Sequence, residues 1–180
     1  MTTVFIGGSR AVSRLNAVIR ERLDDLMNRG CHIFIGDANG ADKAVQKHFA
    51  DHGYENVTVF CTETCRNNVG NWPVRRIRPE SSRRDFSYYA AKDIAMAREA
   101  RCGVMLWDGR SKGTFHNILN LIGAGKKTLV YLAPEKAFYK LAKEQDLEAL
   151  FARYSLREIE RARTALGTLP WEEHLPLHSS

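Results

Sequence analysis

The sequence predicts an α/β protein: a Rossmann-like three-layer sandwich in which a sheet of five or more mainly parallel strands lies between two layers of helices. Two observations support this prediction. Five short runs rich in Val, Ile and Phe are apolar with little alternation, as in strands that are covered on both faces. Between them lie segments whose apolar residues recur every three or four positions, which is the period of an amphipathic helix. Strands that alternate with helices form a parallel sheet with right-handed crossovers.

The apolar runs give the expected strands and the periodic segments give the expected helices. The strands are Val4–Gly7, His32–Ile35, Val57–Cys61, Gly103–Trp107 and Thr128–Leu132. The first helix carries apolar residues from Val12 to Leu26 and ends before Gly30, a residue that commonly terminates helices. The other helices are expected over 41–52, about 86–100, and 114–123.

This order assigns residues 1–134 to one Rossmann-like domain and residues 135–180 to a helical C-terminal extension. In the extension, Ser155-Leu156-Arg157-Glu158 is a capping box that predicts a helix to about Leu166. Residues 62–84 form a long arginine-rich segment with no clear periodicity, and loops of this length in a compact domain are usually functional or disordered.

The composition indicates which ligands, which state of the cysteines and which cellular compartment to expect. Lys and Arg number 27 against 21 Asp and Glu, and this net charge of +6 suits anionic ligands without by itself indicating nucleic acid. The four cysteines form no C-x-x-C pair and are expected to be free thiols. The N-terminus enters a strand directly and no apolar run approaches 18 residues, so a cytoplasmic protein without a membrane partner is expected.

No metal site and no cofactor are predicted. His48 and His52 share a helix face at four-residue spacing, a pattern that more often belongs to a solvated surface than to a zinc site. Apolar residues in the extension favour a homo-oligomer.

Three loops that follow predicted strands have the composition of a ligand site. They are Gly7-Gly8-Ser9-Arg10, Gly36-Asp37-Ala38-Asn39-Gly40-Ala41-Asp42 and Trp107-Asp108-Gly109-Arg110-Ser111-Lys112-Gly113-Thr114. In open α/β sheets, ligands bind beyond the carboxyl ends of the strands. Glycine lets the backbone approach a ligand, arginine pairs with phosphate, and a helix N-terminus binds anions.

Each loop also has a purely structural interpretation. The first loop is compatible with a tight turn beside a surface arginine. In the second loop, Asp42 is compatible with a residue that only compensates the helix dipole. The third loop is least well explained as a capped turn alone.

Asn117 lies one helical turn after Thr114 and is placed to face the same cleft, as His116 is. Lys92 and Asp93, on the third predicted helix, and Arg84, just before it, are further candidates for ligand contact, although solvated charge explains them equally well.

With these loops in place, the chain resembles the SLOG superfamily, named for the SMF/DprA and LOG (lonely guy) proteins. Within it, the chain is most similar to the small proteins grouped with YspA and the circularly permuted YpsA relatives. The matching residues are the three loops together with Lys92-Asp93-Ile94-Ala95-Met96-Ala97. The resemblance covers residues 3 to about 133. It implies a Rossmann-like fold that binds a nucleotide or a nucleotide-derived ligand at the three loops.

The resemblance also defines what an enzyme of this kind would need. LOG-type enzymes hydrolyse the N-glycosidic bond of a nucleoside monophosphate and carry a G-G-x-G-T loop, with a glutamate three residues later. Gly113-Thr114 matches the end of that loop, but the glutamate position holds Asn117. An oxocarbenium-like transition state needs a nearby carboxylate, and Asp108 and Asp93 are the candidate catalytic residues.

Three functions follow. The leading one is a sensor or processing protein that binds a nucleotide or nucleotide sugar, AMP-like or ADP-ribose-like. The second is an N-glycosidic hydrolase. The third is binding of single-stranded nucleic acid, in which the arginines of 66–84 form a cationic strip and Trp72 a stacking platform.

Overall fold

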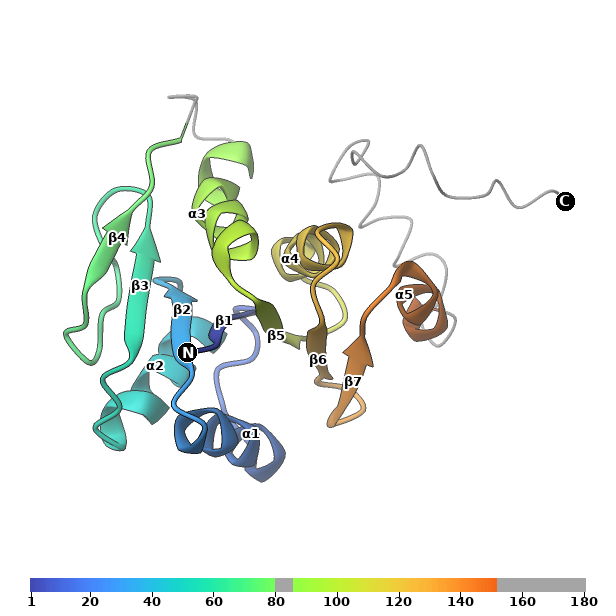
Figure 1. The fold of residues 1–180 in the computed structure, drawn as a ribbon, viewed down its shortest axis with the longest axis horizontal. Helices are drawn as coiled ribbons and strands as arrows, with labels where there is room; N and C mark the ends of the chain where they lie inside the picture. Colours follow the sequence, from blue (N-terminus) through green and yellow to red (C-terminus); the bar gives the residue numbers. More distant parts are fainter. Residues whose placement is uncertain (80–85, 152–180) are drawn as a thin grey trace, which may run out of the picture.

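A single seven-stranded sheet forms the centre of the computed structural model, which describes residues 1–79 and 86–151 (Figure 1). The strand order is β4-β3-β2-β1-β5-β6-β7. The strands are β1 (Thr3–Gly8), β2 (His32–Gly36), β3 (Val57–Cys61), β4 (Val74–Arg76), β5 (Cys102–Trp107), β6 (Thr128–Leu132) and β7 (Ala137–Leu141). Neighbouring strands pair in parallel from β4 to β6, and β7 pairs antiparallel with β6.

Helices cover both faces of this sheet. The helices are α1 (Ala17–Asn28), α2 (Ala41–Asp51), α3 (Phe86–Glu99), α4 (Lys112–Gly123) and α5 (Glu144–Phe151). Helices α1 and α2 pack in one hydrophobic core, whereas α3, α4 and α5 pack in another. Successive residues of a strand supply opposite cores: Val104 belongs to the α1–α2 side and Met105 to the α3–α4 side. The predicted three-layer α/β fold and the parallel pairing of its five strands are confirmed.

Two strands of the sheet were not predicted. Strand β4 lies in the arginine-rich segment after β3, and all three of its residues are exposed, so it has no apolar run. Strand β7 extends the sheet beyond residue 134, into the segment expected to be helical, and α5 follows it. The helix expected from Ser155 to Leu166 lies outside the described residues.

The first helix begins later than its apolar spacing indicates. Val12 is buried, yet it lies in the loop between β1 and α1. Asn16 is the N-cap of α1, and its side chain accepts a hydrogen bond from the backbone nitrogen of Ile19 at 3.0 Å. An N-cap of this kind satisfies an amide that has no partner within the helix, and here it sets the first turn.

The order of the strands places a topological switch point between β1 and β5. The chain runs outward from β1 through β2 and β3 to β4, then returns to add β5 on the other side of β1. Loops that follow β1 and β5 therefore diverge and leave a crevice at the carboxyl ends of the strands, where open α/β sheets bind ligands.

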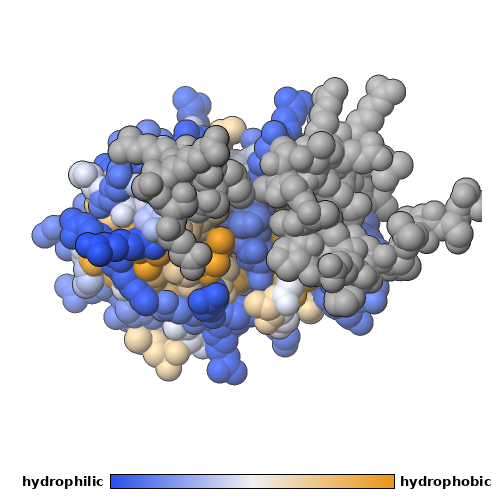
Figure 2. All heavy atoms as spheres, turned by 90° about the horizontal axis from the view of Figure 1, so that it is seen from above, coloured by the Kyte–Doolittle hydropathy of each residue, from blue (hydrophilic) through white to orange (hydrophobic). Residues whose placement is uncertain are grey.

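Among the described helices, none is both long enough and apolar enough to cross a membrane. Seen from above the view of Figure 1, the described surface is mostly hydrophilic, with small apolar groups between the polar side chains (Figure 2).

Candidate functional site

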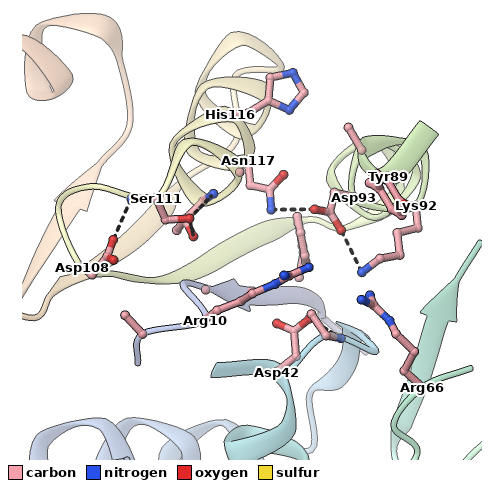
Figure 3. Close-up of a pocket in the computed structure, with 18 residues that line it drawn as sticks. Arg10, Asp42, Arg66, Tyr89, Lys92, Asp93, Asp108, Ser111, His116 and Asn117 are labelled. Atoms are coloured by element: carbon pink, nitrogen blue, oxygen red, sulfur yellow. Dashed lines mark hydrogen bonds and ion pairs between the residues drawn. The ribbon is translucent and has the colours of Figure 1, made fainter. Parts of the chain in front are cut away.

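A cleft of about 460 Å³ lies at the switch point, bounded by the loops after β1, β2 and β5 and by the helices α3 and α4 (Figure 3). Most of the candidate residues from the sequence line it. These are Gly7, Gly8, Arg10, Asp42, Lys92, Asp93, Asp108, Ser111, Gly113, Thr114 and Asn117. Residues from the loops after three strands and from two separate helices thus meet around one hollow.

The other described candidates support the walls of this cleft, whereas Arg84 lies outside the described residues. The supporting residues are Ser9, Gly36, Asp37, Asn39, Gly40, Trp107 and Gly109, and their contacts are described below. Residues Arg66, Tyr89 and His116 also line the cleft.

Ser9 joins the loop after β1 to the loop after β5. Its side chain is fully buried, and its Oγ donates a hydrogen bond to Asp108 Oδ1 at 2.9 Å. The hydroxyls of Ser9 and Thr114 lie 3.2 Å apart. The same Asp108 oxygen accepts the backbone amides of Arg110 and Ser111 at 3.0 and 2.8 Å. Asp108 therefore organises its own loop, while Gly109, at φ 82°, provides the turn.

The N-terminus of α4 opens into the cleft. Ser111 is its N-cap and accepts a hydrogen bond from the Thr114 amide at 3.4 Å. The indole nitrogen of Trp107 donates to the Ser111 carbonyl at 3.0 Å and fixes the start of the helix. A Cβ added at Gly113 would have no neighbouring atom within 4 Å, so there is open space beside this residue in the first turn of α4. Amides of a first helical turn have no partner within the helix and favour anions.

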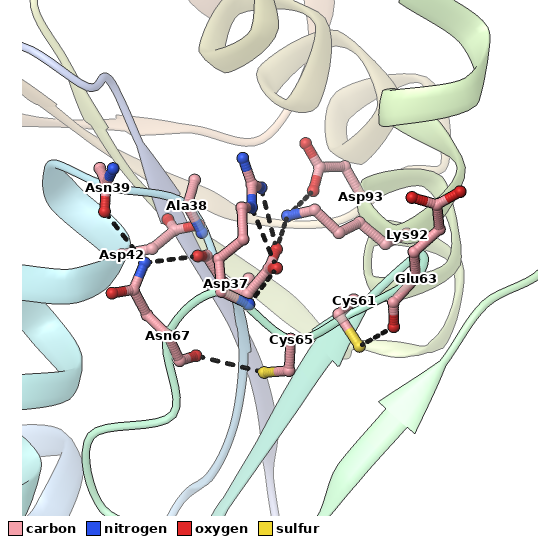
Figure 4. Close-up of polar contacts among 12 residues, drawn as sticks. Asp37, Ala38, Asn39, Asp42, Cys61, Glu63, Cys65, Asn67, Lys92 and Asp93 are labelled. Atoms are coloured by element: carbon pink, nitrogen blue, oxygen red, sulfur yellow. Dashed lines mark hydrogen bonds and ion pairs between the residues drawn. The ribbon is translucent and has the colours of Figure 1, made fainter. Parts of the chain in front are cut away.

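A buried ionic cluster closes the opposite end of the cleft (Figure 4). Lys92 extends from α3 and its Nζ lies 3.4 Å from Asp37 Oδ1 and 3.3 Å from Asp93 Oδ1. Asp42, at the start of α2, is also buried beside this ammonium group. Three carboxyl groups thus surround one buried lysine, and Asp93 is the one of them that is partly exposed to the cleft.

The cluster shifts the ionisation of its members. Burial raises the pKa of Asp42 to about 7, since the nearby Lys92 charge compensates only part of the desolvation. Burial would lower the pKa of Lys92, but the charges of Asp93, Asp42 and Asp37 outweigh it and raise that pKa. Lys92 is therefore the permanent cation of the cluster, while Asp42 exchanges its proton near neutral pH.

Arg66 clamps the loop after β3 onto Asp37. Its Nε and Nη2 donate to the two carboxylate oxygens at 3.1 Å each, and its backbone amide donates at 3.0 Å. Burial opposes ionisation of Asp37, but these hydrogen bonds and the Lys92 charge lower its pKa overall. Asn67 extends the clamp by donating to the Asp37 carbonyl and to Asn39 Oδ1 at 2.7 and 3.1 Å.

Two glycines of the second loop are required by close approach. A Cβ at Gly36 would lie 2.5 Å from both Asp42 Oδ2 and Lys92 Nζ, so this glycine makes room for the buried charges. Gly40 has φ 85°, and a Cβ there would lie 2.3 Å from the Arg10 carbonyl oxygen. Gly40 therefore allows the second loop to pack against the backbone that carries Arg10.

Asn117 of α4 contacts a carboxylate from another helix. Its Nδ2 donates to Asp93 Oδ2 at 3.2 Å. Its Oδ1 is buried and, among the described residues, receives no hydrogen bond. Buried polar atoms are rarely left without a partner in proteins, so this oxygen is a candidate for contact with a bound molecule. Asn117 thus has a neighbouring carboxylate on α3.

The sequence did not single out Arg66 and Tyr89. Arg66 is one of several arginines in a segment without periodicity, and nothing in its spacing distinguishes it. Tyr89 precedes Lys92 by three residues on α3, and this helical spacing was the available signal. His116 is half-buried, and burial lowers the pKa of its imidazole although Asp93 opposes the shift.

No protein-family model matches the chain, and no curated protein matches it. The fold is similar to a solved structure of DNA processing protein A from Helicobacter pylori, described for its single-stranded DNA binding mode. The TM-score is 0.54 at 13% sequence identity, and the match covers 92% of this chain and 80% of that one. At this identity the likeness establishes the fold alone.

Proposed function

We propose that this protein belongs to the SLOG superfamily and binds a nucleotide or nucleotide-derived ligand, such as AMP or ADP-ribose, in the cleft at the carboxyl edge of the sheet. The observation that carries the proposal is the unequal chemistry of the two ends of the cleft. One end presents the N-terminus of α4 and a bare glycine. The other presents carboxyl groups, an amide and a tyrosine beside the cations Lys92 and Arg66, and Arg10 extends between the two ends (Figure 3).

The α4 end suits a phosphate group. The first-turn amides that the Ser111 cap does not bind, together with the helix dipole, attract an anion, and Gly113 leaves it space to approach. Arg10 extends into the cleft and carries a guanidinium that can form paired hydrogen bonds with phosphate oxygens (Figure 3).

The α3 end suits a sugar and a base. Asp93 offers carboxylate oxygens to hydroxyl groups, and Asn117 Oδ1 can accept a further hydrogen bond. Tyr89 is half exposed at the rim, where its ring can contact a planar base. The cleft volume of about 460 Å³ falls within the range of small-molecule sites, roughly 300–1,000 Å³.

Calorimetric titration with AMP, ADP-ribose, NAD and cyclic dinucleotides tests the proposal. We expect at least one to bind with Kd below about 1 mM, which corresponds to roughly −4 kcal/mol. Gly113→Ala should weaken that binding at least tenfold while leaving the protein folded, because the added methyl group enters the cleft and meets no protein atom.

A matched pair of charge variants separates site contacts from overall charge. Arg10→Gln should weaken binding, whereas Arg20→Gln, an exposed arginine on α1, should not. Failure of every nucleotide to bind below 1 mM, or equal loss in both variants, would exclude the proposal.

A second candidate function is hydrolysis of an N-glycosidic bond, favoured by the 3.2 Å contact between Asp93 and Asn117. Water would add across the bond, leaving a hydroxyl on the sugar carbon and a proton on the base. We take Asp93 as the acting carboxylate because it lies beside Asn117 and Lys92, whereas Asp108 Oδ1 joins the loops after β1 and β5. Chromatography of AMP and ADP-ribose incubations should show free base with the wild type and none with Asp93→Asn. Release that persists in that variant would contradict this role.

A third candidate is single-stranded DNA binding, favoured by the likeness to DNA processing protein A. One part of the sequence-based hypothesis is wrong: Trp72 is buried, and its indole nitrogen donates to the Tyr54 carbonyl, so it offers no stacking platform. The exposed arginines of β4 remain candidates for contact with DNA. Fluorescence anisotropy with a labelled oligothymidine should show binding that weakens steeply with salt. Binding that ignores salt, or no binding, would exclude this function.

A further inference from the structure

We propose that Asp24, His48 and His52 form a binding site for a divalent transition-metal ion such as Zn²⁺, between α1 and α2. Among the residues that the structure describes, these are the group of three potential ligands whose donor atoms all lie within 4.8 Å of one another. The proposal is independent of the nucleotide cleft.

The three side chains converge from two helices. His48 and His52 are four residues apart on α2, which places their rings on one face, with centroids 4.4 Å apart. Asp24 comes from α1, and its Oδ1 lies 2.7 Å from His48 Nε2. Two imidazoles and a carboxylate are ligands that zinc commonly accepts, with a fourth position left to water.

The surroundings orient the two imidazoles. His52 Nδ1 lies 2.8 Å from the backbone carbonyl of His48. A carbonyl only accepts hydrogen bonds, so this nitrogen carries the proton and the lone pair of a neutral ring is on Nε2. Hydrogen bonds from the non-ligating nitrogen to a carbonyl are typical of metal-bound histidines. The His48 side chain is only 9% exposed, which restricts its movement.

Small side-chain rotations would close the site. Three ligands at about 2.0–2.2 Å from a tetrahedral ion lie roughly 3.4 Å from one another. The present separations, from 2.7 Å to at most 4.8 Å, bracket that value. The ion would replace the direct contact between Asp24 and His48 and would link α1 to α2.

The site is remote from the nucleotide cleft. Asp42 lines the cleft from the first turn of α2, and His48 follows it by six residues, about 9 Å along a helix axis. A metal ion here would contact none of the cleft residues, so its primary effect is on the packing of the two helices.

Zinc titration of the full chain after chelator treatment tests the site. We expect one equivalent of Zn²⁺ to bind with micromolar affinity and to raise the melting temperature. His52→Gln removes an exposed ligand without disturbing the core, and should weaken Zn²⁺ binding at least tenfold and abolish the thermal shift. Asp24→Asn should weaken binding as well.

The matched control uses the other histidine pair at the same spacing. His174 and His178 are also four residues apart in the sequence. The double variant His174→Gln/His178→Gln should bind Zn²⁺ as the wild type does. Unchanged affinity in His52→Gln, or loss of binding in the control instead, would overturn the proposal.

Discussion

Lys92 on α3 and Asp37 at the end of β2 form a buried ion pair, with Lys92 Nζ 3.4 Å from Asp37 Oδ1. The two side chains are 7% and 3% exposed. This pair fixes the helix that carries Tyr89 and Asp93 against the strand that leads into the second loop. The geometry of the cleft therefore depends on a buried ion pair in its wall.

Replacement of Lys92 by methionine should destabilise the protein strongly. The variant leaves Asp37, Asp42 and Asp93 without their shared cation, and loss of one partner of a buried ion pair costs about 3–5 kcal/mol. Urea unfolding at pH 8 measures the change. Lys47→Met, which removes an exposed lysine paired with Asp51, should change stability by less than about 1 kcal/mol. Equal effects of the two substitutions would contradict the role of the cluster.

Stability should fall as pH rises from about 4 to about 7 because of Asp42. The pKa of this carboxyl group is about 7 in the folded protein, above the roughly 3.9 of an unfolded chain. Over that window the folded chain holds a proton that the unfolded chain has released, so this group lowers the free energy of unfolding by roughly 1.4 kcal/mol per pH unit.

The variant Asp42→Asn isolates this effect, because its side chain is neutral at every pH. Its advantage in stability over the wild type should grow between pH 5 and pH 7 and then level off. Asp37 acts in the opposite direction and at lower pH: its pKa is lowered by folding, so its contribution is lost as the solution becomes more acidic. Parallel stability curves for wild type and Asp42→Asn would show that Asp42 does not titrate in this range.

Gly36→Ala should disrupt the same cluster by sterics alone. The new Cβ would lie 2.5 Å from atoms of both Asp42 and Lys92, and overpacking of this kind typically costs about 1–3 kcal/mol. Gly113→Ala is the control: its Cβ meets no atom, and alanine within a helix stabilises by roughly 0.5–1 kcal/mol relative to glycine. Thermal unfolding of the two variants should shift in opposite directions.

Arg66→Lys should loosen the loop after β3 while leaving the sheet intact. Lysine retains the charge but cannot reproduce the paired hydrogen bonds to Asp37. Hydrogen exchange should become faster over residues 62–69 and remain unchanged in β1 and β5. Slow exchange throughout that loop would show that its hydrogen bonds to Gln46 suffice to hold it.

The buried strands could be predicted because their residues are apolar on both faces, a property that depends on no distant partner. The edge strands β4 and β7 could not be. Strand β4 is three exposed residues whose extended form is set by pairing with β3. In α1, apolar spacing alone extended the helix back to Val12, whereas the Asn16 cap determines where it begins.

In the candidate site, too, some features could be predicted from the sequence and others could not. Glycines and small polar residues after strands β1, β2 and β5 indicated the three loops, because that composition is needed locally for a close turn. The contacts of Lys92 depend on where α3 docks, which spacing along the chain does not reveal. Likewise, the approach of Asp24 to His48 joins two helices whose sequences carry no common motif.

The short strand β4 affects the tendency of the protein to associate with other copies of itself. An open sheet edge offers unpaired backbone groups to any extended chain, and proteins avoid this with short, charged edge strands. Here Arg75 pairs with Glu99 of α3, and Arg76 Nε donates to the Glu63 carbonyl, so this short edge strand carries a charged side chain on each face of the sheet. The arginines that suggest affinity for nucleic acid thereby also discourage strand addition and aggregation at the side of the sheet where β4 is the last of the described strands.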